Sequence, residues 1–102
     1  MMDLDFHFEA ELWLYSGKAS WYFVTVPNET SEQIRMFQPG RRGFGSVRVR
    51  VSIGETNWKT SLFPDRASGC FFLPVKADVR KKEKLGVGDR LAIEIRTNAE
   101  LF

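Results

Sequence analysis

The stretch Val47-Arg48-Val49-Arg50-Val51-Ser52-Ile53 decides the fold class. Its β-branched apolar residues alternate with two arginines and a serine, and a period of two places the two sets on opposite faces of an extended strand. Gly54-Glu55-Thr56 follows as a turn signal, and Asn57–Leu62 is predicted to return as the hairpin partner. The pattern therefore indicates a strand with one face in a core and the other in water.

Four further segments of the chain are predicted to be strands. Asp5–Tyr15 alternates cleanly, and after the turn Ser16-Gly17-Lys18 the segment Trp21–Val26 is predicted to pair with it as a hairpin. Cys70–Val75 is a short apolar run, and Arg90–Arg96 alternates again. Together with the hairpin of Val47–Ile53 and Asn57–Leu62, these segments give six strands.

Two segments indicate short helices. Thr30-Ser31-Glu32-Gln33 fits a capping box with Thr30 as the N-cap, and Ile34 and Phe37 are then placed on a core-facing side. The second helix is predicted over Ala77–Lys84, with Gly86 suited to the left-handed position after a helix end. Both helices follow a strand directly.

The predicted order of elements is β-β-α-β-β-β-α-β. Many short antiparallel strands with little helix favour a mainly β, six-stranded barrel with two short helices, because closure removes exposed edges. We expect a single domain over residues 1–96 and a frayed C-terminal tail over 97–102. Two similar segments each lead into a predicted helix, Val24-Thr25-Val26-Pro27 and Phe72-Leu73-Pro74-Val75. A pseudo-twofold barrel would produce such a weak internal similarity.

Composition places the chain among ordinary globular proteins. Its 102 residues are 43% hydrophobic and 27% charged, which is unlike a disordered chain. No run of about eighteen apolar residues is present, so we expect no membrane span. The start of the chain is acidic and soon alternates, unlike a secretory signal, so a cytoplasmic location is expected.

The net charge of +2 is unevenly distributed along the chain. Residues 1–34 hold one basic and six acidic residues, whereas residues 35–102 hold fourteen basic and seven acidic ones. One interpretation is a basic face for an acidic partner. The favoured one is neutralisation of the acidic first strand by basic later strands. Pairing of Arg48 and Arg50 with Glu9 and Glu11 is an alternative to a binding role for these arginines.

Several motifs of the second half of the chain form a recognisable set. They are Phe44-Gly45-Ser46-Val47-Arg48-Val49, Trp58-Lys59-Thr60-Ser61-Leu62-Phe63-Pro64-Asp65, Leu73-Pro74-Val75-Lys76, Val79-Arg80-Lys81 and Val87-Gly88-Asp89, joined by Phe6–Tyr15 and Trp21–Pro27. In this order and spacing they resemble the DUF1905 family of bacterial and archaeal proteins. The resemblance implies a double-split β-barrel, an architecture shared with AbrB-type transcription regulators, which bind DNA as dimers. Some relatives carry this domain beside a second one linked to bacteriocin protection, and the family brings no established catalytic residues.

The residues needed for familiar hydrolytic or metal chemistry are few. His7 is the only histidine and Cys70 the only cysteine, so neither a nucleophile–base–orienter set nor a Cys/His zinc site is indicated. Cys70 is interpreted as a small core residue. Gly40–Gly45 lacks the Gly-Lys-Ser/Thr ending of a phosphate loop. We therefore expect no catalytic residues, no metal and no cofactor.

A basic loop and the strand that follows it form the candidate binding surface. Arg41 and Arg42 are suited to grip phosphate or carboxylate, with Phe44 available to stack, and Arg48 and Arg50 project from one strand face. The leading hypothesis is a non-enzymatic binding or interaction module for an anionic ligand or partner, nucleic acid included.

Three alternatives stay open. The first is a small enzyme with a pocket at the barrel mouth, and the second is a DNA-binding regulator by analogy of fold. The third is a scaffold that associates with itself or with another protein. The basic run from Arg80 to Lys84 is interpreted as a solvated helix face.

Overall fold

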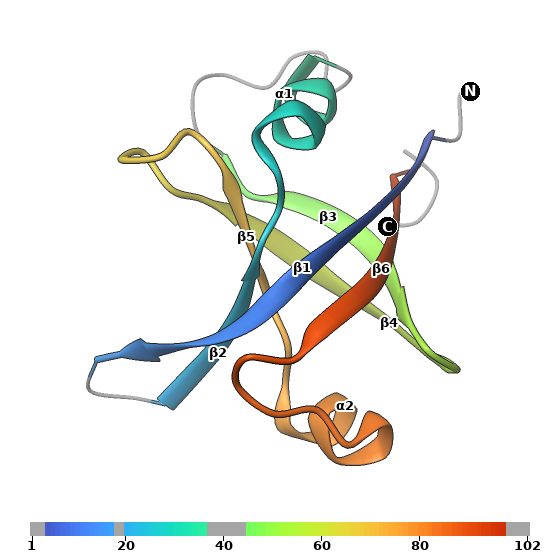
Figure 1. Cartoon of the computed structure of the whole chain (residues 1–102). Helices are drawn as coiled ribbons and strands as arrows, with labels where there is room; N and C mark the ends of the chain where they lie inside the picture. The colour runs from blue at the N-terminus through green and yellow to red at the C-terminus, as the bar shows by residue number, and fades with distance from the viewer. Residues whose placement is uncertain (1–3, 18–19, 37–44, 98–102) are drawn as a thin grey trace.

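The order of the elements follows the alternation of the sequence. A computed structural model describes residues 4–17, 20–36 and 45–97, which form six strands and two helices (Figure 1). The elements are β1 (Leu4–Ser16), β2 (Ser20–Thr25), α1 (Asn28–Met36), β3 (Val47–Ile53), β4 (Thr56–Pro64), β5 (Phe71–Pro74), α2 (Ala77–Glu83) and β6 (Arg90–Thr97). This is the predicted order, and the mainly β fold class is confirmed.

The strands of the described residues close into a barrel in the order β1-β2-β5-β4-β3-β6. Every neighbouring pair is antiparallel. The long strand β1 closes the sheet, because its first part pairs with β6 and its last part pairs with β2. The six-stranded barrel is therefore confirmed, and the first and last strands of the sequence lie side by side (Figure 1).

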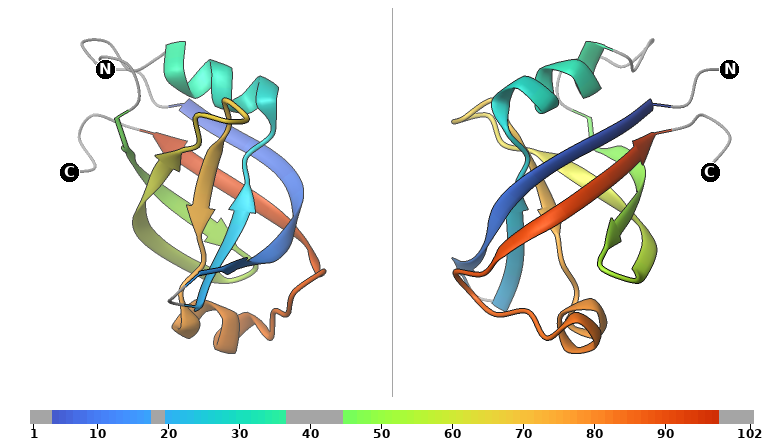
Figure 2. Two further views of the ribbon diagram at one scale, coloured as in Figure 1. Left: turned by 90° about the vertical axis from the view of Figure 1, so that its left-hand side faces the viewer. Right: turned by 45° about the vertical axis from the view of Figure 1, so that its right-hand side comes forward.

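The topology has a pseudo-twofold arrangement. Exchanging β1-β2-α1-β3 with β4-β5-α2-β6 reproduces the same cyclic strand order. Strands β2 and β5 are neighbours that run in opposite directions, and each leads to a helix at the opposite end of the barrel (Figure 2). The Val26 N–H donates to the Phe71 carbonyl and the Val75 N–H donates to the Tyr22 carbonyl, both at 2.9 Å. The weak internal similarity between the two strand-to-helix segments of the sequence therefore corresponds to a repeated arrangement in the fold.

The core consists of the inward-facing side chains of the barrel and one residue from each helix. In β3, four apolar residues are buried and the residues between them are not. Ile34 of α1 and Val79 of α2 are buried with them. Cys70 is buried as expected, and Trp58 points inward as well. The remaining core residues include Leu12, Val24, Val26, Leu62, Phe71, Leu73, Leu91, Ile93 and Ile95.

The start of α1 differs from the predicted capping box. The helix begins at Asn28, and the Ser31 N–H donates to the Pro27 carbonyl at 2.8 Å, so Thr30 lies inside the helix and is not its N-cap. The physical reason is a tertiary contact. The buried Ser31 hydroxyl donates to the Val26 carbonyl at 3.1 Å and accepts the Phe71 N–H at 3.0 Å. Phe37, the other expected core residue, lies outside the described residues.

The end of α2 also differs from the prediction. Lys84, with φ 56°, takes the left-handed position that was assigned to Gly86. The Leu85 N–H then donates to the Arg80 carbonyl at 2.9 Å, as in a Schellman motif. This early turn lets Leu85 pack against the core.

Two further features lie at the ends of strands. Strand β6 runs to Thr97, which is buried, one residue beyond the predicted end of the strand. The β3–β4 turn has Gly54 at φ 59° and is held by α2, because the Glu83 carboxylate accepts the Thr56 hydroxyl at 2.6 Å. The same Glu83 oxygen accepts the Glu55 N–H at 3.2 Å.

Candidate functional site

Four cations gather on the outer face of β6, β3 and β4. The inward valines of β3 turn Arg48 and Arg50 outward. In register, Arg50 lies between Lys59 of β4 and Arg96 of β6. We call Arg48, Arg50, Lys59 and Arg96 the basic strip.

The basic strip places like charges opposite each other on neighbouring strands. Like charges directly opposite each other lower the stability of a sheet. Arg96 is partly compensated, because its Nε donates to Asp5 Oδ1 at 3.0 Å and its Nη2 lies 4.0 Å from Glu94 Oε2. Placing Arg50 between two other cations nevertheless concentrates positive charge on this part of the barrel.

The predicted binding residues divide into two groups. Arg48 and Arg50 lie on one outer face of β3, as the alternation predicted. Arg41, Arg42 and Phe44 lie outside the described residues, so their convergence with the strand arginines stays a prediction. Lys59 and Arg96 were not among the candidates. Lys59 was identifiable as the outward residue of the hairpin partner, whereas Arg96 required the strand order.

The acidic side chains of β1 face β6. Arg90 Nε donates to Glu9 Oε1 at 3.1 Å, and Arg96 pairs with Asp5. Neutralisation of the acidic first strand by a basic later strand is therefore confirmed. The alternative pairing of Arg48 and Arg50 with Glu9 and Glu11 does not occur, because β6 lies between β1 and β3.

A second outer surface carries aromatic side chains from four strands. Except for Thr25, the outward positions of β2 are apolar like its inward ones, a signal already present in the sequence of Trp21–Val26. We call this surface the aromatic face. Its residues are Trp13 and Tyr15 of β1, Trp21 and Phe23 of β2, Phe63 of β4 and Phe72 of β5.

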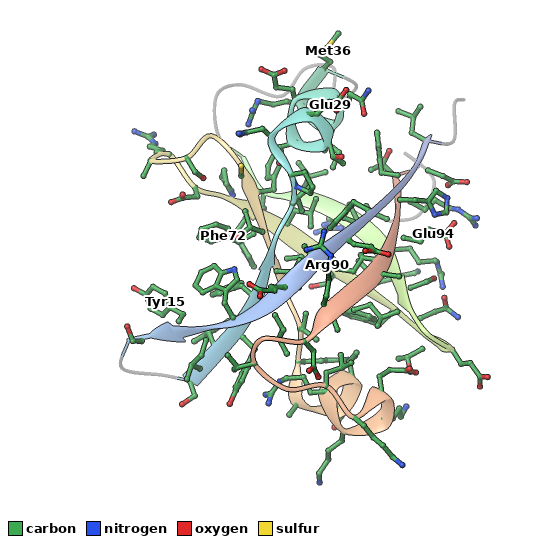
Figure 3. All side chains as sticks on the ribbon, viewed as in Figure 1. Tyr15, Glu29, Met36, Phe72, Arg90 and Glu94 are labelled. Atoms are coloured by element: carbon green, nitrogen blue, oxygen red, sulfur yellow. The ribbon has the colours of Figure 1, made fainter. Side chains whose placement is uncertain are left out.

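The rings of the aromatic face pack against one another and stay accessible. Trp21 stacks on Phe23 with centroids 5.8 Å apart and an interplanar angle of 11°. Trp13 meets Phe72 edge to face at 5.0 Å. Tyr15, Trp21 and Phe63 are 52%, 48% and 42% exposed, and Figure 3 shows Tyr15 and Phe72 on the same side of the barrel. The face is thus a pre-arranged set of rings with open faces and edges.

The basic strip and the aromatic face meet on β4. Lys59, Ser61 and Phe63 follow one another on the outer side of this strand. Arg48 is opposite Ser61, which makes it a diagonal neighbour of Phe63, at roughly 7–8 Å. Phe63 is in turn opposite Phe72. The two surfaces therefore form one continuous path.

A hollow of about 420 Å³ lies between β1, β6 and the β3–β4 turn. His7, Glu94 and Ser52 are among its lining residues, and His7 Nε2 lies 3.7 Å from Glu94 Oε2. The enzyme hypothesis calls for a buried acid in a cleft. Glu94 has 34% of its side chain exposed, and the hollow is open to solvent. The hollow therefore adds little to that hypothesis.

Other chemistry-bearing groups have structural surroundings. The Cys70 thiol donates to Asn28 Oδ1 at 3.0 Å, which links the start of α1 to the residue before β5. Within residues 4–17, 20–36 and 45–97, no three His, Cys, Asp or Glu side chains come together as a metal site would require. Neither helix of that part of the chain is long and apolar enough to cross a membrane.

The comparisons with known proteins identify one family. No curated protein matches the chain. A family model described as "Domain of unknown function (DUF1905)" matches residues 8–95, which spans the barrel from β1 to β6. The match covers most of the chain, and the chain therefore belongs to the DUF1905 family.

Proposed function

We propose that this domain is a binding module for an anionic ligand or partner, and that the basic strip is its contact surface. The observation that carries the proposal is the register of Arg50 between Lys59 and Arg96. Three cations side by side on one outer face offer an anion several charge-assisted contacts at once.

The chemistry of the strip suits a ligand with several anionic groups. Guanidinium groups donate two parallel hydrogen bonds to phosphate or carboxylate, and such charge-assisted bonds are stronger than neutral ones. The cations repeat across strands about 4.8 Å apart, on an outer strand surface. Small molecules are bound mostly in concave sites, so the strip fits an extended anion better than a small metabolite.

The test compares two double variants that remove the same charge. Arg48→Ala/Arg50→Ala removes two cations of the strip, and Lys81→Ala/Lys82→Ala removes two exposed cations from α2. Binding of labelled single-stranded DNA and of inorganic polyphosphate is measured between about 50 and about 200 mM salt. We expect the strip variant to bind at least tenfold more weakly, with a salt slope on single-stranded DNA reduced by about 1.4, because each phosphate contact on a single strand contributes about 0.7 to the slope.

The α2 variant is expected to bind like the wild type. Equal losses in both variants would mean that only overall charge matters, and the assignment to the strip would be wrong. The proposal as a whole fails if the wild type binds neither polyanion at the lower salt concentration.

A further inference from the structure

The aromatic face needs an explanation that folding alone does not provide. The outer side of an antiparallel barrel in water is normally polar. Single exposed apolar residues are common, but contiguous ones mark a binding surface. Here three rings that are about half exposed, Tyr15, Trp21 and Phe63, adjoin three more deeply packed ones.

The packed rings hold the exposed ones in place. Trp13 is held in place by a hydrogen bond from its Nε1 to Thr25 Oγ1 at 2.9 Å. Phe23 touches Trp13, Tyr15 and Trp21 at centroid distances of 5.3–6.3 Å. A ligand that stacks on the exposed rings therefore meets an ordered surface and loses little ordering free energy.

Resting on the proposed function of the basic strip, we propose that the ligand is single-stranded nucleic acid. Its phosphates contact the basic strip and its bases stack on the aromatic face. The junction of Arg48 with Phe63 carries the inference, because it joins a cationic track to a stacking platform without interruption. This combination is how sequence-tolerant single-strand binders work.

The size of the path fits several nucleotides. From Arg50 to Lys59, along β4 to Phe63, across β5 and along β2 to Trp21, the surface path is about 40 Å, given the spacing of strands and of residues along β4 and β2. Barrel domains that bind single strands contact about 4 to 16 nucleotides. In a duplex the faces of the bases are stacked on one another. A duplex can therefore contact the basic strip through its phosphates, but its bases cannot stack on the aromatic face.

A protein partner or a second copy of this chain fits the surface less well. Protein interfaces are enriched in aromatic residues and arginine but depleted of lysine and of acidic residues. Here Arg48 is a diagonal neighbour of Phe63, and Lys59, a residue type depleted at interfaces, belongs to the same basic strip as Arg48. Cations next to stacking rings favour a ligand that supplies both anions and flat rings.

The experiment uses three probes and two groups of variants. The probes are oligothymidylate, a DNA duplex of the same length and inorganic polyphosphate. Tyr15→Ala/Trp21→Ala removes two exposed rings, and Trp21→Leu removes one ring while keeping an apolar side chain. Met36→Ala is the control, since Met36 is highly exposed and lies at α1, away from the aromatic face (Figure 3).

We expect the wild type to prefer oligothymidylate over both other probes and to show quenched tryptophan fluorescence only with it. Tyr15→Ala/Trp21→Ala should bind oligothymidylate at least tenfold more weakly and polyphosphate as before, because stacking contributes to each base contact but not to phosphate contacts. Trp21→Leu should show a smaller loss of the same kind, and Met36→Ala none. Circular dichroism of each variant checks that the barrel is folded.

The experiment distinguishes failure of this inference from failure of the proposed function. If the ring variants bind oligothymidylate like the wild type, or if the wild type binds polyphosphate equally well, the inference is overturned while the proposed function stands. If no polyanion binds, the proposed function has failed. If sedimentation shows a wild-type dimer that Tyr15→Ala/Trp21→Ala dissociates, the aromatic face is an interface between copies and the inference is overturned.

Discussion

At the scale of single residues, Ser31 and Arg80 make equivalent hydrogen bonds in the two halves of the barrel. Each lies five residues after a buried valine, and each donates a side-chain hydrogen bond to that valine's carbonyl. Ser31 bonds to Val26 at 3.1 Å, and Arg80 Nε bonds to Val75 at 3.1 Å. The Arg80 guanidinium also lies 3.6 Å from the centroid of the Tyr22 ring, a cation–π contact. Arg80 is thus a structural residue, and only its lysine neighbours fit the solvated face predicted from the sequence.

Replacing Ser31 by alanine is expected to destabilise the protein. The change leaves the Val26 carbonyl and the Phe71 N–H without their buried partner, which costs about 1–3 kcal/mol of unfolding free energy. Urea denaturation followed by circular dichroism measures the loss. The exposed Ser46→Ala is the control and should change stability by less than about 0.5 kcal/mol. Equal stability of the two variants would contradict this role for the buried hydroxyl.

At the scale of elements, α2 shows how a helix end depends on its surroundings. Local reasoning assigned the left-handed position to Gly86, since glycine adopts it without strain. The helix instead ends at Glu83, with Lys84 in the left-handed position, so that Glu83 reaches the β3–β4 turn and Leu85 reaches the core. These two tertiary contacts outweigh the backbone strain of a lysine at φ 56°.

Lys84→Gly is expected to stabilise the protein modestly. Glycine relieves the left-handed strain, worth about 1–2 kcal/mol, and loses part of that gain through the greater freedom of the unfolded chain. We expect a net gain of up to about 1 kcal/mol in thermal or urea unfolding. The matched change Lys82→Gly, inside the same helix, should lower stability by about 1 kcal/mol. A loss of stability in Lys84→Gly would show that its side chain matters more than its backbone.

At the scale of the whole molecule, the barrel is closed by the pairing of β1 with β6, and two kinds of contact support that closure. On the outside, ion pairs join Asp5 to Arg96 and Glu9 to Arg90, all with largely exposed side chains. On the inside, fully buried residues such as Leu73 fill the barrel. Exposed ion pairs contribute little, whereas buried aliphatic side chains contribute several kilocalories per mole.

We therefore expect Asp5→Asn/Glu9→Gln to lower the unfolding free energy by less than about 1 kcal/mol. Leu73→Ala, which opens a cavity in the core, should lower it by about 2–5 kcal/mol. Both variants are measured by urea denaturation at low salt, where ion pairs are least screened. A larger loss in the charge variant than in the cavity variant would mean that the outer ion pairs, and not the core, hold the barrel closed.

The sequence by itself determined the elements and the faces of the strands. Alternation with a period of two is a local property, so β3, its outward Arg48 and Arg50, and the six-stranded order with two helices could all be predicted. Only the tertiary structure decided which strands are neighbours and in which register. That non-local pairing places Lys59 and Arg96 beside Arg50 and turns Glu9 toward Arg90. It also gathers aromatic residues from four strands on one face, because closing a barrel unites outer positions that lie far apart along the chain.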